Sequence, residues 1–259
     1  MNIISILKLT PFFPHWLEFR QYGKLELRLI DNLYGQVLEV GCGNGELKRL
    51  SKKYNNKITN YLATDYFSWD DLFMQQQKSE QLALGSGLFG KVKKVQNIDK
   101  VANATNLDFD NASFDCHVSS EVIEHIDDID KYFSEAYRVL KNDSLLIIKA
   151  PYLYREHPND TYDYRRISRG GYKYLAKKHG FKVVSIYSNI FFGGTICTLT
   201  NQYIIRKIME SNNYLLKSVL FLLSPIIFFT SNVLGFLLDS FDRDYRFSTN
   251  YLVVMRKLS

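Results

Sequence analysis

Cysteine is scarce in this 259-residue chain, which holds only Cys42, Cys116 and Cys197, far apart in the sequence. No two of them form a C-x-x-C pair, so the sequence indicates neither a zinc knuckle nor a disulfide framework. Tryptophan is also rare, with two residues, whereas tyrosine and phenylalanine contribute 18 each. The cysteine usage is typical of a protein from a reducing compartment.

The chain also lacks the signals of secretion, internal repeats and nucleic-acid binding. Its first residues, MNIISILKL, form a short apolar stretch with no basic leader and no small-residue cleavage site, so we expect no signal peptide. No repeat of roughly 20 to 50 residues is visible. The net charge of +6, from 33 basic and 27 acidic residues, is only mildly basic. We therefore expect a cytoplasmic protein with no nucleic-acid partner.

Short apolar runs alternate with helical patterns along most of the chain. Apolar residues at helical spacing predict a helix over Ile129–Leu140. Another helix is expected to begin after Ser168, a residue typical of an N-cap, and to end before Gly180. This alternation predicts an α/β fold whose mostly parallel sheet is covered on both faces. The predicted strands are Val37–Val40, Tyr61–Thr64, Phe114–Ser119, Leu145–Ala150, Lys182–Tyr187 and Tyr251–Arg256.

A long apolar segment, 190–249, separates the last two predicted strands. Within it, Ser218–Leu238 contains no charged residue and is long enough to span a bilayer. A single crossing is excluded, because both flanking strands belong to one sheet. Pro225 and Gly235 suit breaks, so we expect a short helical hairpin, buried against the domain or dipping into one leaflet. Peripheral contact with the inner face of a membrane is thus an open alternative, supported by the basic residues Arg206, Lys207 and Lys217.

The most specific motif is VLEVGCGNGEL, in which a predicted strand leads into Gly41, Gly43 and Gly45. Glycines allow a tight turn and let the backbone approach a ligand closely. The dinucleotide fingerprint G-x-G-x-x-G fails, because Glu46 stands at its third glycine. Asp65 ends the second strand, twenty residues after Gly45, where a carboxylate can accept hydrogen bonds from both ribose hydroxyls of a nucleoside. Together these features predict a nucleoside-containing ligand.

The order of the motifs resembles class I methyltransferases that use S-adenosylmethionine, in particular the subgroup called type 11 methyltransferases. After the glycine loop, NATNLDFDNASFDCHVSSEVIEHIDD and RVLKNDSLLIIKAP are similar to later motifs of the family. The resemblance covers roughly residues 35–190 and the last strand. It implies a Rossmann-like sheet of seven strands with an antiparallel last strand. We expect one domain, 1–259, with an N-terminal helical segment 1–35 and an apolar helical insertion 190–249.

The resemblance also implies which residues bind S-adenosylmethionine. Glu39 and the glycine loop would hold the methionine part, Asp65 the ribose hydroxyls, and Tyr66 would lie along the adenine. Asn103 stands where the family usually has an aspartate facing the adenine amino group; it can accept a hydrogen bond but brings no charge. Ser119 would lie where the methyl group is presented. The implied set is Glu39, Gly41, Gly43, Gly45, Asp65, Tyr66, Asn103, Ala104 and Ser119.

Glu121, Glu124 and His125 form the pattern E-x-x-E-H after the strand Phe114–Ser119. A neutral imidazole at His125 could act as a general base, with a plain acidic helix start as the alternative. The pattern is also similar to the divalent-metal sites of small-RNA 2′-O-methyltransferases and some ubiquinone-pathway O-methyltransferases, with His157 as a further ligand. We do not expect a metal, because many type 11 members carry this pattern without known metal use. The catalytic candidates are His125, Glu121 and His157.

The polar and aromatic segment EHPNDTYDYRR, Glu156–Arg166, follows the fifth strand, where the fold usually grips its acceptor. Its side chains could hold sugar hydroxyls or a phosphate, although a solvated loop packed by its aromatics is the alternative. We predict methyl transfer to an oxygen or nitrogen of a sugar or glycolipid, as in surface-polysaccharide pathways. One rival is a cofactor-binding but inactive, membrane-associated partner protein. The other is a nicotinamide dehydrogenase, which Glu46 disfavours.

Overall fold

The computed structural model describes residues 9–66, 98–156 and 162–259. The chain divides into two compact units. The helical unit comprises Met1–Leu25, Leu153–Arg155 and Ser188–Asn250, and the sheet unit comprises Glu26–Tyr152, Glu156–Tyr187 and Tyr251–Ser259. Helix α2 (Trp16–Asp31) belongs in part to each unit. The candidate site residues that the structure describes all belong to the sheet unit.

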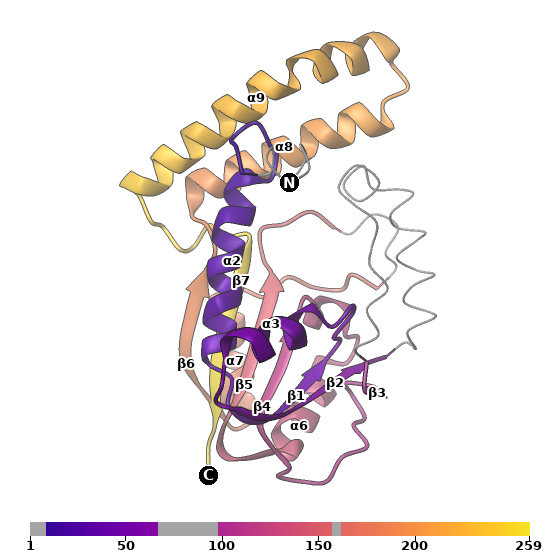
Figure 1. The fold of residues 1–259 in the computed structure, drawn as a ribbon, viewed down its shortest axis with the longest axis vertical. Coiled ribbons are helices and arrows are strands. Elements are labelled where there is room, and N and C mark those ends of the chain that lie inside the picture. The colour runs from indigo at the N-terminus through magenta and orange to yellow at the C-terminus, as the bar shows by residue number, and fades with distance from the viewer. Residues whose placement is uncertain (1–8, 67–97, 157–161) are drawn as a thin grey trace. The chain divides into compact units, whose positions relative to one another are not determined.

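The sheet unit is built on seven strands in the order β3-β2-β1-β4-β5-β7-β6 (Figure 1). β1 is parallel to β2 and β4, and β4 is parallel to β5. β7 runs opposite to β5 and β6 in Figure 1, so the predicted seven-stranded sheet with an antiparallel last strand is confirmed. The strands are β1 (Gly35–Val40), β2 (Ile58–Asp65), β3 (Lys100–Val101), β4 (Phe114–Ser120), β5 (Leu140–Pro151), β6 (Phe181–Ser188) and β7 (Asn250–Lys257). The helices are α3 (Glu46–Tyr54), the 3-10 helix η1 (Ile123–His125), α6 (Ile129–Val139) and α7 (Arg169–Lys178).

The register of the central strands fixes where the functional loops begin. Val40 is paired with Thr64 of β2 and with Ser119 of β4, so the three parallel strands end side by side and their carboxyl ends form one edge of the sheet. Ser120, one residue further, is paired with Lys149 of β5. Ligands of open α/β sheets bind outside the carboxyl ends of the strands. The glycine loop, Asp65 and the E-x-x-E-H pattern all lie at this edge.

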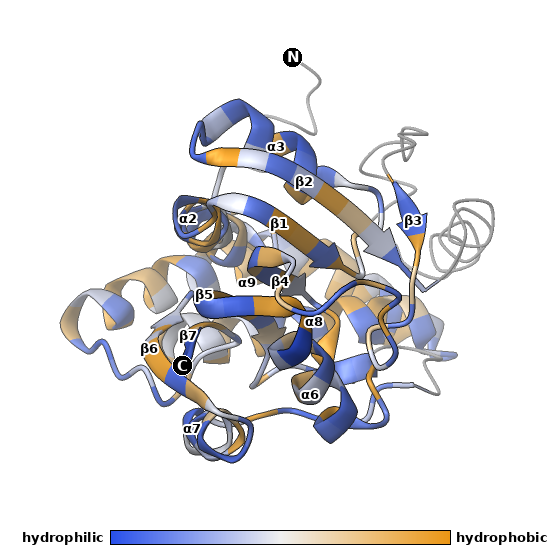
Figure 2. Ribbon diagram, turned by 90° about the horizontal axis from the view of Figure 1, so that it is seen from below, coloured by the Kyte–Doolittle hydropathy of each residue, from blue (hydrophilic) through white to orange (hydrophobic). Residues whose placement is uncertain are grey.

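A single apolar cluster joins one face of the sheet to α6 and α7. Alternate residues of β1 and β5 contribute to it, among them Leu38 and Leu146. Tyr132 and Phe133 of α6 are fully buried in it. Burying one such side chain contributes about 1.5–3 kcal/mol, so this cluster fixes the helices on the sheet. Figure 2 shows β1 and β2 side by side, with hydrophobic segments in both strands.

The helices and strands predicted for the sheet unit are confirmed, with small differences at their ends. Each of the six predicted strands lies within an observed strand. Ser168 caps α7 as predicted, because its hydroxyl accepts a hydrogen bond from Gly171 N at 3.1 Å. Asp128 caps α6 in the same way, through Lys131 N at 3.0 Å. Strand Lys100–Val101 was not predicted, because two residues carry no periodicity.

In the helical unit the uncharged stretch forms one helix, and the predicted break inside it is wrong. α9 (Tyr214–Phe241) runs through Pro225 and packs along α8 (Phe192–Glu210), so these two helices make the hairpin (Figure 1). Pro225 has no N–H to donate to the Phe221 carbonyl one turn earlier. The Ser224 hydroxyl donates to that carbonyl instead, at 2.8 Å. This substitute bond satisfies the carbonyl and lets the helix continue.

Gly235 allows α8 and α9 to pack closely and does not break the helix. A Cβ atom there would lie 2.8 Å from Cys197 Sγ and 3.0 Å from Gly193 O, so only glycine allows α8 and α9 to approach at this point. The side-chain amide of Asn232 donates to Pro11 O and Phe13 O, each at 2.8 Å, and so attaches the N-terminal segment to the hairpin. The buried residues of α9 are Ser224, Phe228, Asn232 and Gly235. Many of the large apolar side chains of the helix are exposed.

Candidate cofactor and acceptor site

Three glycines in the left-handed region shape the loop after β1. Gly41, Gly43 and Gly45 have φ angles of 68°, 52° and 72°, which L side chains rarely adopt. A Cβ atom on Gly41 would lie 2.3 Å from a methyl group of Val122, so packing also requires glycine there. A Cβ atom on Gly43 would meet no atom of the described residues within 4 Å. The loop therefore has open space at Gly43, where a ligand can approach the backbone.

Asp65, at the end of β2, holds this loop in place. Its Oδ2 atom accepts a hydrogen bond from Gly43 N at 2.8 Å, and the residue is buried. The loop is also fixed by Cys42 N, which donates to Thr64 O at 2.9 Å. The carboxylate predicted to bind ribose thus lies directly against the open glycine and organises the loop before a ligand binds.

Glu39 places a buried carboxyl group at the end of β1. The residue is 2% exposed, and its Oε2 atom accepts a hydrogen bond from the Tyr61 hydroxyl at 3.0 Å. Burial raises the pKa of Glu39 to about 8; the hydrogen bond from Tyr61 opposes the rise, and the neighbouring Glu26 and Asp65 add to it. The protonated form is therefore favoured at neutral pH. A cation bound beside Glu39 would favour the ionised form instead.

Two further cofactor candidates lie beside Asp65. Tyr66 is 62% exposed, as a ring that stacks on a ligand needs to be. The Asn103 Oδ1 atom accepts hydrogen bonds from the Thr105 backbone N and hydroxyl, both at 2.9 Å. Its neighbour Ala104 is buried. An adenine amino group would have to compete with the two Thr105 donors for the Asn103 oxygen.

The side chain of Ser119 is directed into the core. Its hydroxyl is 2.8 Å from the Tyr132 hydroxyl of α6, and both residues are fully buried. Burial raises the pKa of Tyr132, against the smaller effect of this hydrogen bond. The hydroxyl of Ser119 is thus committed to packing, and its backbone is the part that can face a ligand at the strand end.

A network of one lysine and two glutamates lies where β4 ends. Lys149 of β5 is 1% exposed, and its Nζ atom is 2.8 Å from Glu26 Oε2 and 3.7 Å from Glu121 Oε1. Glu121 has a φ angle of 57°, and its N donates to Lys149 O at 2.8 Å. A left-handed backbone conformation at a non-glycine residue costs roughly 1–2 kcal/mol of free energy. Residues held in this way often lie at functional sites, so Glu121 stays a candidate site residue.

Glu124 and Tyr172 carry buried polar atoms that the described residues do not satisfy. Both carboxyl oxygens of Glu124 and the hydroxyl of Tyr172 lack a hydrogen-bond partner within the described ranges. Burial raises the pKa of Glu124 to about 8, and the neighbouring Glu121 raises it further. An unsatisfied buried polar group costs about 1–3 kcal/mol.

His125 ends η1 and faces the predicted acceptor segment. Its Nδ1 atom is 3.1 Å from the Tyr162 carbonyl oxygen. Because a carbonyl only accepts, we assign the proton to Nδ1, which makes Nε2 the nitrogen that can accept one. Nε2 is 3.9 Å from Glu124 Oε1, and Tyr164 N donates to Glu124 O at 2.8 Å. The structure thus brings together two segments that sequence analysis treated separately.

The arginines of the acceptor segment fix this junction. Arg166 forms paired, charged hydrogen bonds with Asp163, one of them at 2.7 Å. Arg165 donates to the carbonyls of Ile126 and Asp127, the latter at 2.8 Å. Arg165 therefore holds the segment against the two residues that follow the E-x-x-E-H pattern, whereas the pair of Arg166 with Asp163 fixes the segment internally.

His157 lies outside the described residues, so its catalytic and metal-binding roles stay predictions. Across residues 9–66, 98–156 and 162–259, no group of three or more His, Cys, Asp or Glu side chains could hold a metal ion.

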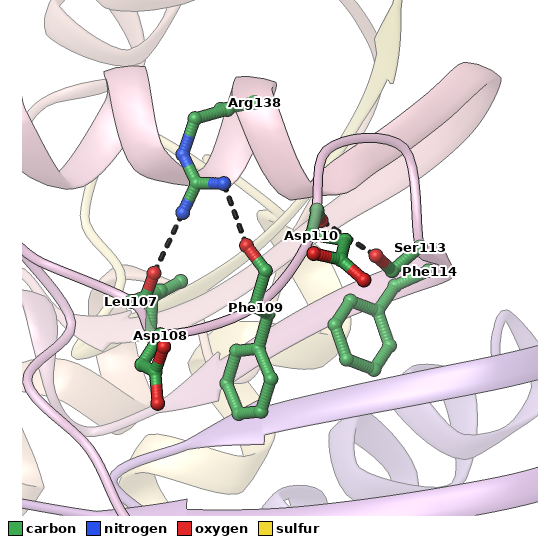
Figure 3. A pocket seen from close by; sticks show the side chains of 7 residues that line it. All are labelled: Leu107, Asp108, Phe109, Asp110, Ser113, Phe114 and Arg138. Carbon is green, nitrogen blue, oxygen red and sulfur yellow. Dashed lines mark hydrogen bonds between the residues drawn. The ribbon is translucent and has the colours of Figure 1, made fainter.

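A hollow of about 380 Å³ lies at a different place in the sheet unit (Figure 3). It reaches Phe114, the first residue of β4, and so lies at the opposite end of that strand from Ser120. Arg138 donates to Leu107 O and Phe109 O, both at 2.7 Å, and so ties this loop to α6. The hollow contains none of the candidate residues. Its lining residues are Leu107, Asp108, Phe109, Asp110, Ser113, Phe114 and Arg138.

Sequence reasoning missed Lys149, Glu26 and Tyr172. Lys149 interrupts the apolar run LLIIKAP, and a charge inside a buried strand is a usable signal for a buried ion pair. Glu26 gives no signal, because acids are common on helices. Tyr172 reads as an ordinary apolar helix position, and only the fold brings it within electrostatic range of Glu124.

Residues 38–148 match a family model described as a methyltransferase domain. This range contains the glycine loop, Asp65 and the E-x-x-E-H pattern. A curated relative, the ubiquinone/menaquinone biosynthesis C-methyltransferase UbiE of Rickettsia massiliae, is 32% identical over 116 residues. The match covers 44% of this chain and 44% of the relative, so the chain spans less than half the length of the relative.

Solved structures with a similar fold include the geranyl diphosphate C-methyltransferase of Streptomyces coelicolor. That protein was crystallised with Mg2+, geranyl diphosphate and S-adenosyl-L-homocysteine; the TM-score is 0.52 at 14% identity, over 94% of this chain and 82% of that one. The cyclase SpnF has a TM-score of 0.51 at 14% identity, over 91% and 80%. Likenesses at this identity show the fold alone. Because one of these proteins is named a cyclase, the fold alone does not determine the reaction.

Proposed function

We propose that the chain is a class I S-adenosylmethionine-dependent methyltransferase that transfers a methyl group from this cofactor to a small-molecule acceptor, as the match of residues 38–148 to a methyltransferase domain supports. The observation that carries the proposal is the glycine loop, which has open space at Gly43 and is held by Asp65. A preformed loop of this kind, at the carboxyl end of the first strand, suits a nucleoside-containing ligand.

The residues around the loop fit the cofactor. Asp65 would accept hydrogen bonds from the ribose hydroxyls, and Tyr66 would lie along the adenine. Glu39 would face the methionine amino group, since a positive charge favours the ionised form of a buried carboxyl group. α3 begins directly after Gly45, so its first N–H groups suit the methionine carboxylate. The cofactor supplies an activated methyl group, and the protein aligns the acceptor and removes its proton.

His125, Glu121 and Glu124 would form the acceptor side of the site. His125 would take the proton of an acceptor hydroxyl or amine at Nε2, because the Tyr162 carbonyl holds the other nitrogen protonated. Lys149 would position Glu121 through the ion pair and the backbone bond described above. A polar acceptor would also provide the hydrogen-bond partner that the described residues do not give Glu124.

The acceptor that we favour is an oxygen or nitrogen of a sugar or glycolipid, as in a surface-polysaccharide pathway at the inner face of a membrane. A general base is useful for such atoms, because they lose a proton on methylation. Tyr162 and Tyr164 are 61% and 48% exposed, and tyrosines combine an apolar ring with a hydroxyl that suits sugars. A quinone precursor is the second candidate, because the relative with 32% identity is named a ubiquinone/menaquinone C-methyltransferase.

The test is to incubate the protein with S-adenosylmethionine and fractionated lipids and glycans, and to locate the transferred methyl group by mass spectrometry. We expect a methyl group on a glycan or its lipid-linked form. A methyl group on a quinone ring would favour the second candidate. Cofactor binding without transfer to any fraction would contradict both, and would leave an inactive, cofactor-binding partner protein.

A further inference from the structure

The α8–α9 hairpin has small and polar residues inside and large apolar residues outside. On α9 the buried stripe includes Ser224, Asn232 and Gly235, with Phe228 as its large apolar member. The buried residues of α8 are Gly193, Gly194, Thr195, Cys197, Thr198, Asn201 and Gln202. A helical hairpin whose outer surface is in water would show the reverse pattern, with its apolar side chains buried between the helices. Small and polar residues at helix–helix contacts are what helices surrounded by lipid use.

The outward side of α9 is apolar over most of its circumference. Its exposed side chains include Leu215, Phe221, Leu222, Ile226, Leu234 and Leu237, with Leu222 at 74% and Ile226 at 63%. At 100° per residue, the exposed apolar positions away from the ends of α9 cover an arc of about 200°. An arc of this width exceeds what one flat protein partner can cover, whereas lipid can surround it. Of the helices in the described ranges, α9 alone is long and apolar enough to cross a membrane.

We propose that the α8–α9 hairpin inserts into the surface of an anionic lipid bilayer and lies flat in one leaflet. Charged residues stand at both ends of the hairpin and not in its middle. Arg206, Lys207 and Lys217 are near the turn between the helices, where Glu210, 3.5 Å from Arg206, is the one acid and leaves a net positive charge. Asp239 and Asp242 are near the other end. Both ends can then stay at the head groups while the uncharged middle enters the acyl region, and the three basic residues attract anionic lipid.

The helix lengths exclude a crossing. In α8 the uncharged part, 192–205, is about 21 Å long, which is shorter than the roughly 30 Å of a hydrocarbon core. A pair of crossings would therefore place the charges of Arg206 and Lys207 inside that core, where they are costly. A single crossing by α9 is excluded, because the hairpin connects β6 to β7, which are neighbours in one sheet.

This inference deepens the proposed function, on which its biological meaning depends. A hairpin held in one leaflet would keep the methyltransferase fold of the same chain at the surface where lipid-linked acceptors are dissolved. The acceptor class expected from it is a lipid-linked molecule with a polar head group.

The experiment is flotation of the purified full chain with vesicles of phosphatidylcholine, with and without phosphatidylglycerol. The test variant carries Leu222→Glu and Ile226→Glu, at outward positions of α9. The control carries Leu258→Glu, at an apolar residue of the sheet unit that is 46% exposed. We expect binding to anionic vesicles, a loss of at least tenfold in the test variant, and no loss in the control. Alkaline carbonate should release the bound protein.

Absence of vesicle binding by the wild-type chain would overturn the proposal. If the wild-type chain were instead an oligomer that the two α9 substitutions dissociate, the apolar surface would belong to a second copy of the chain. Protease cleavage on the far side of the vesicle would overturn the flat orientation. S-adenosylmethionine affinity, measured by calorimetry without lipid, should be equal in all three proteins, so that failure of the proposed cofactor site is seen separately.

Discussion

Replacement of Lys149 by methionine should destabilise the sheet unit and displace Glu121. Lys149 is 1% exposed, and its Nζ atom is 2.8 Å from Glu26 and 3.7 Å from Glu121. Methionine keeps most of the side-chain length but removes the charge. Two carboxylates would then share a partly buried space with no cation between them, and the strained backbone at Glu121 would lose part of its support.

The expected magnitude follows from how much water reaches the two glutamates. Removing one partner of a fully buried pair costs about 3–5 kcal/mol. Here the side chains of Glu26 and Glu121 are 16% and 33% exposed, so water relieves part of the cost. We expect a loss of about 2–3 kcal/mol in the free energy of unfolding. For a protein of this size that corresponds to a decrease in Tm of roughly 4–12 °C.

Chemical denaturation and thermal melting measure this loss, with Lys141→Met as the matched control. Lys141 makes an ion pair with Asp115 at the same distance, 2.8 Å, but its side chain is 42% exposed. Exposed pairs contribute less than about 1 kcal/mol. Adding Glu26→Gln to Lys149→Met should restore part of the stability, because it removes an unpaired charge. Equal stability of the two lysine variants would refute the reasoning.

Three other changes test the site. Gly43→Ala should weaken S-adenosylmethionine binding at least tenfold in calorimetry and cost about 1–2 kcal/mol of stability. Gly41→Ala should lower Tm further, because its Cβ atom would lie 2.3 Å from Val122. The opposite ranking of the two melting temperatures would contradict the loop geometry. Burial raises the pKa of Glu39 from its ordinary value of 4.5 to about 8, so its contribution to stability is full below pH 4.5 and is lost as the pH rises from there to about 8. Glu39→Gln should flatten that decrease in a denaturation series, and an unchanged slope would exclude Glu39 as its cause. His125→Ala should slow methyl transfer about 100-fold without changing cofactor affinity, with His15→Ala as the control. A chelator should not affect the wild type, and loss of activity with the chelator would point to a metal.

Sequence patterns predicted the framework of the site because its determinants are local. Glycines at alternate positions after an apolar strand imply a turn with positive φ, and Gly41, Gly43 and Gly45 all adopt it. Asp65 was predicted to end the second strand, and β2 does end there. Short apolar runs likewise predicted six of the seven strands, and helical spacing predicted α6.

Features that depend on contacts between residues far apart in the chain could not be predicted from the sequence. Lys149 and Glu26 are 123 residues apart, and neither shows which charge it will meet. The hydrogen bond from Gly43 to Asp65 also joins separate strands, so sequence analysis predicted the ligand role of Asp65 but not its role in the loop. Pro225 misled the analysis of the insertion, because the local rule for proline does not include a neighbouring Ser224 that satisfies the freed carbonyl.

Calorimetric titration of S-adenosylmethionine into the wild type, Asp65→Ala and Asp65→Asn tests most directly whether the glycine loop and Asp65 bind the cofactor. Asparagine retains an oxygen that can accept the Gly43 N–H, so it separates the shape of the loop from the charge at the ribose. We predict saturable binding by the wild type and an affinity tens-fold or more lower in Asp65→Ala, which corresponds to about 2–4 kcal/mol for two lost hydrogen bonds to an ionised group. Asp65→Asn should lie between them. Unchanged affinity in a folded Asp65→Ala protein would contradict the assignment of this site.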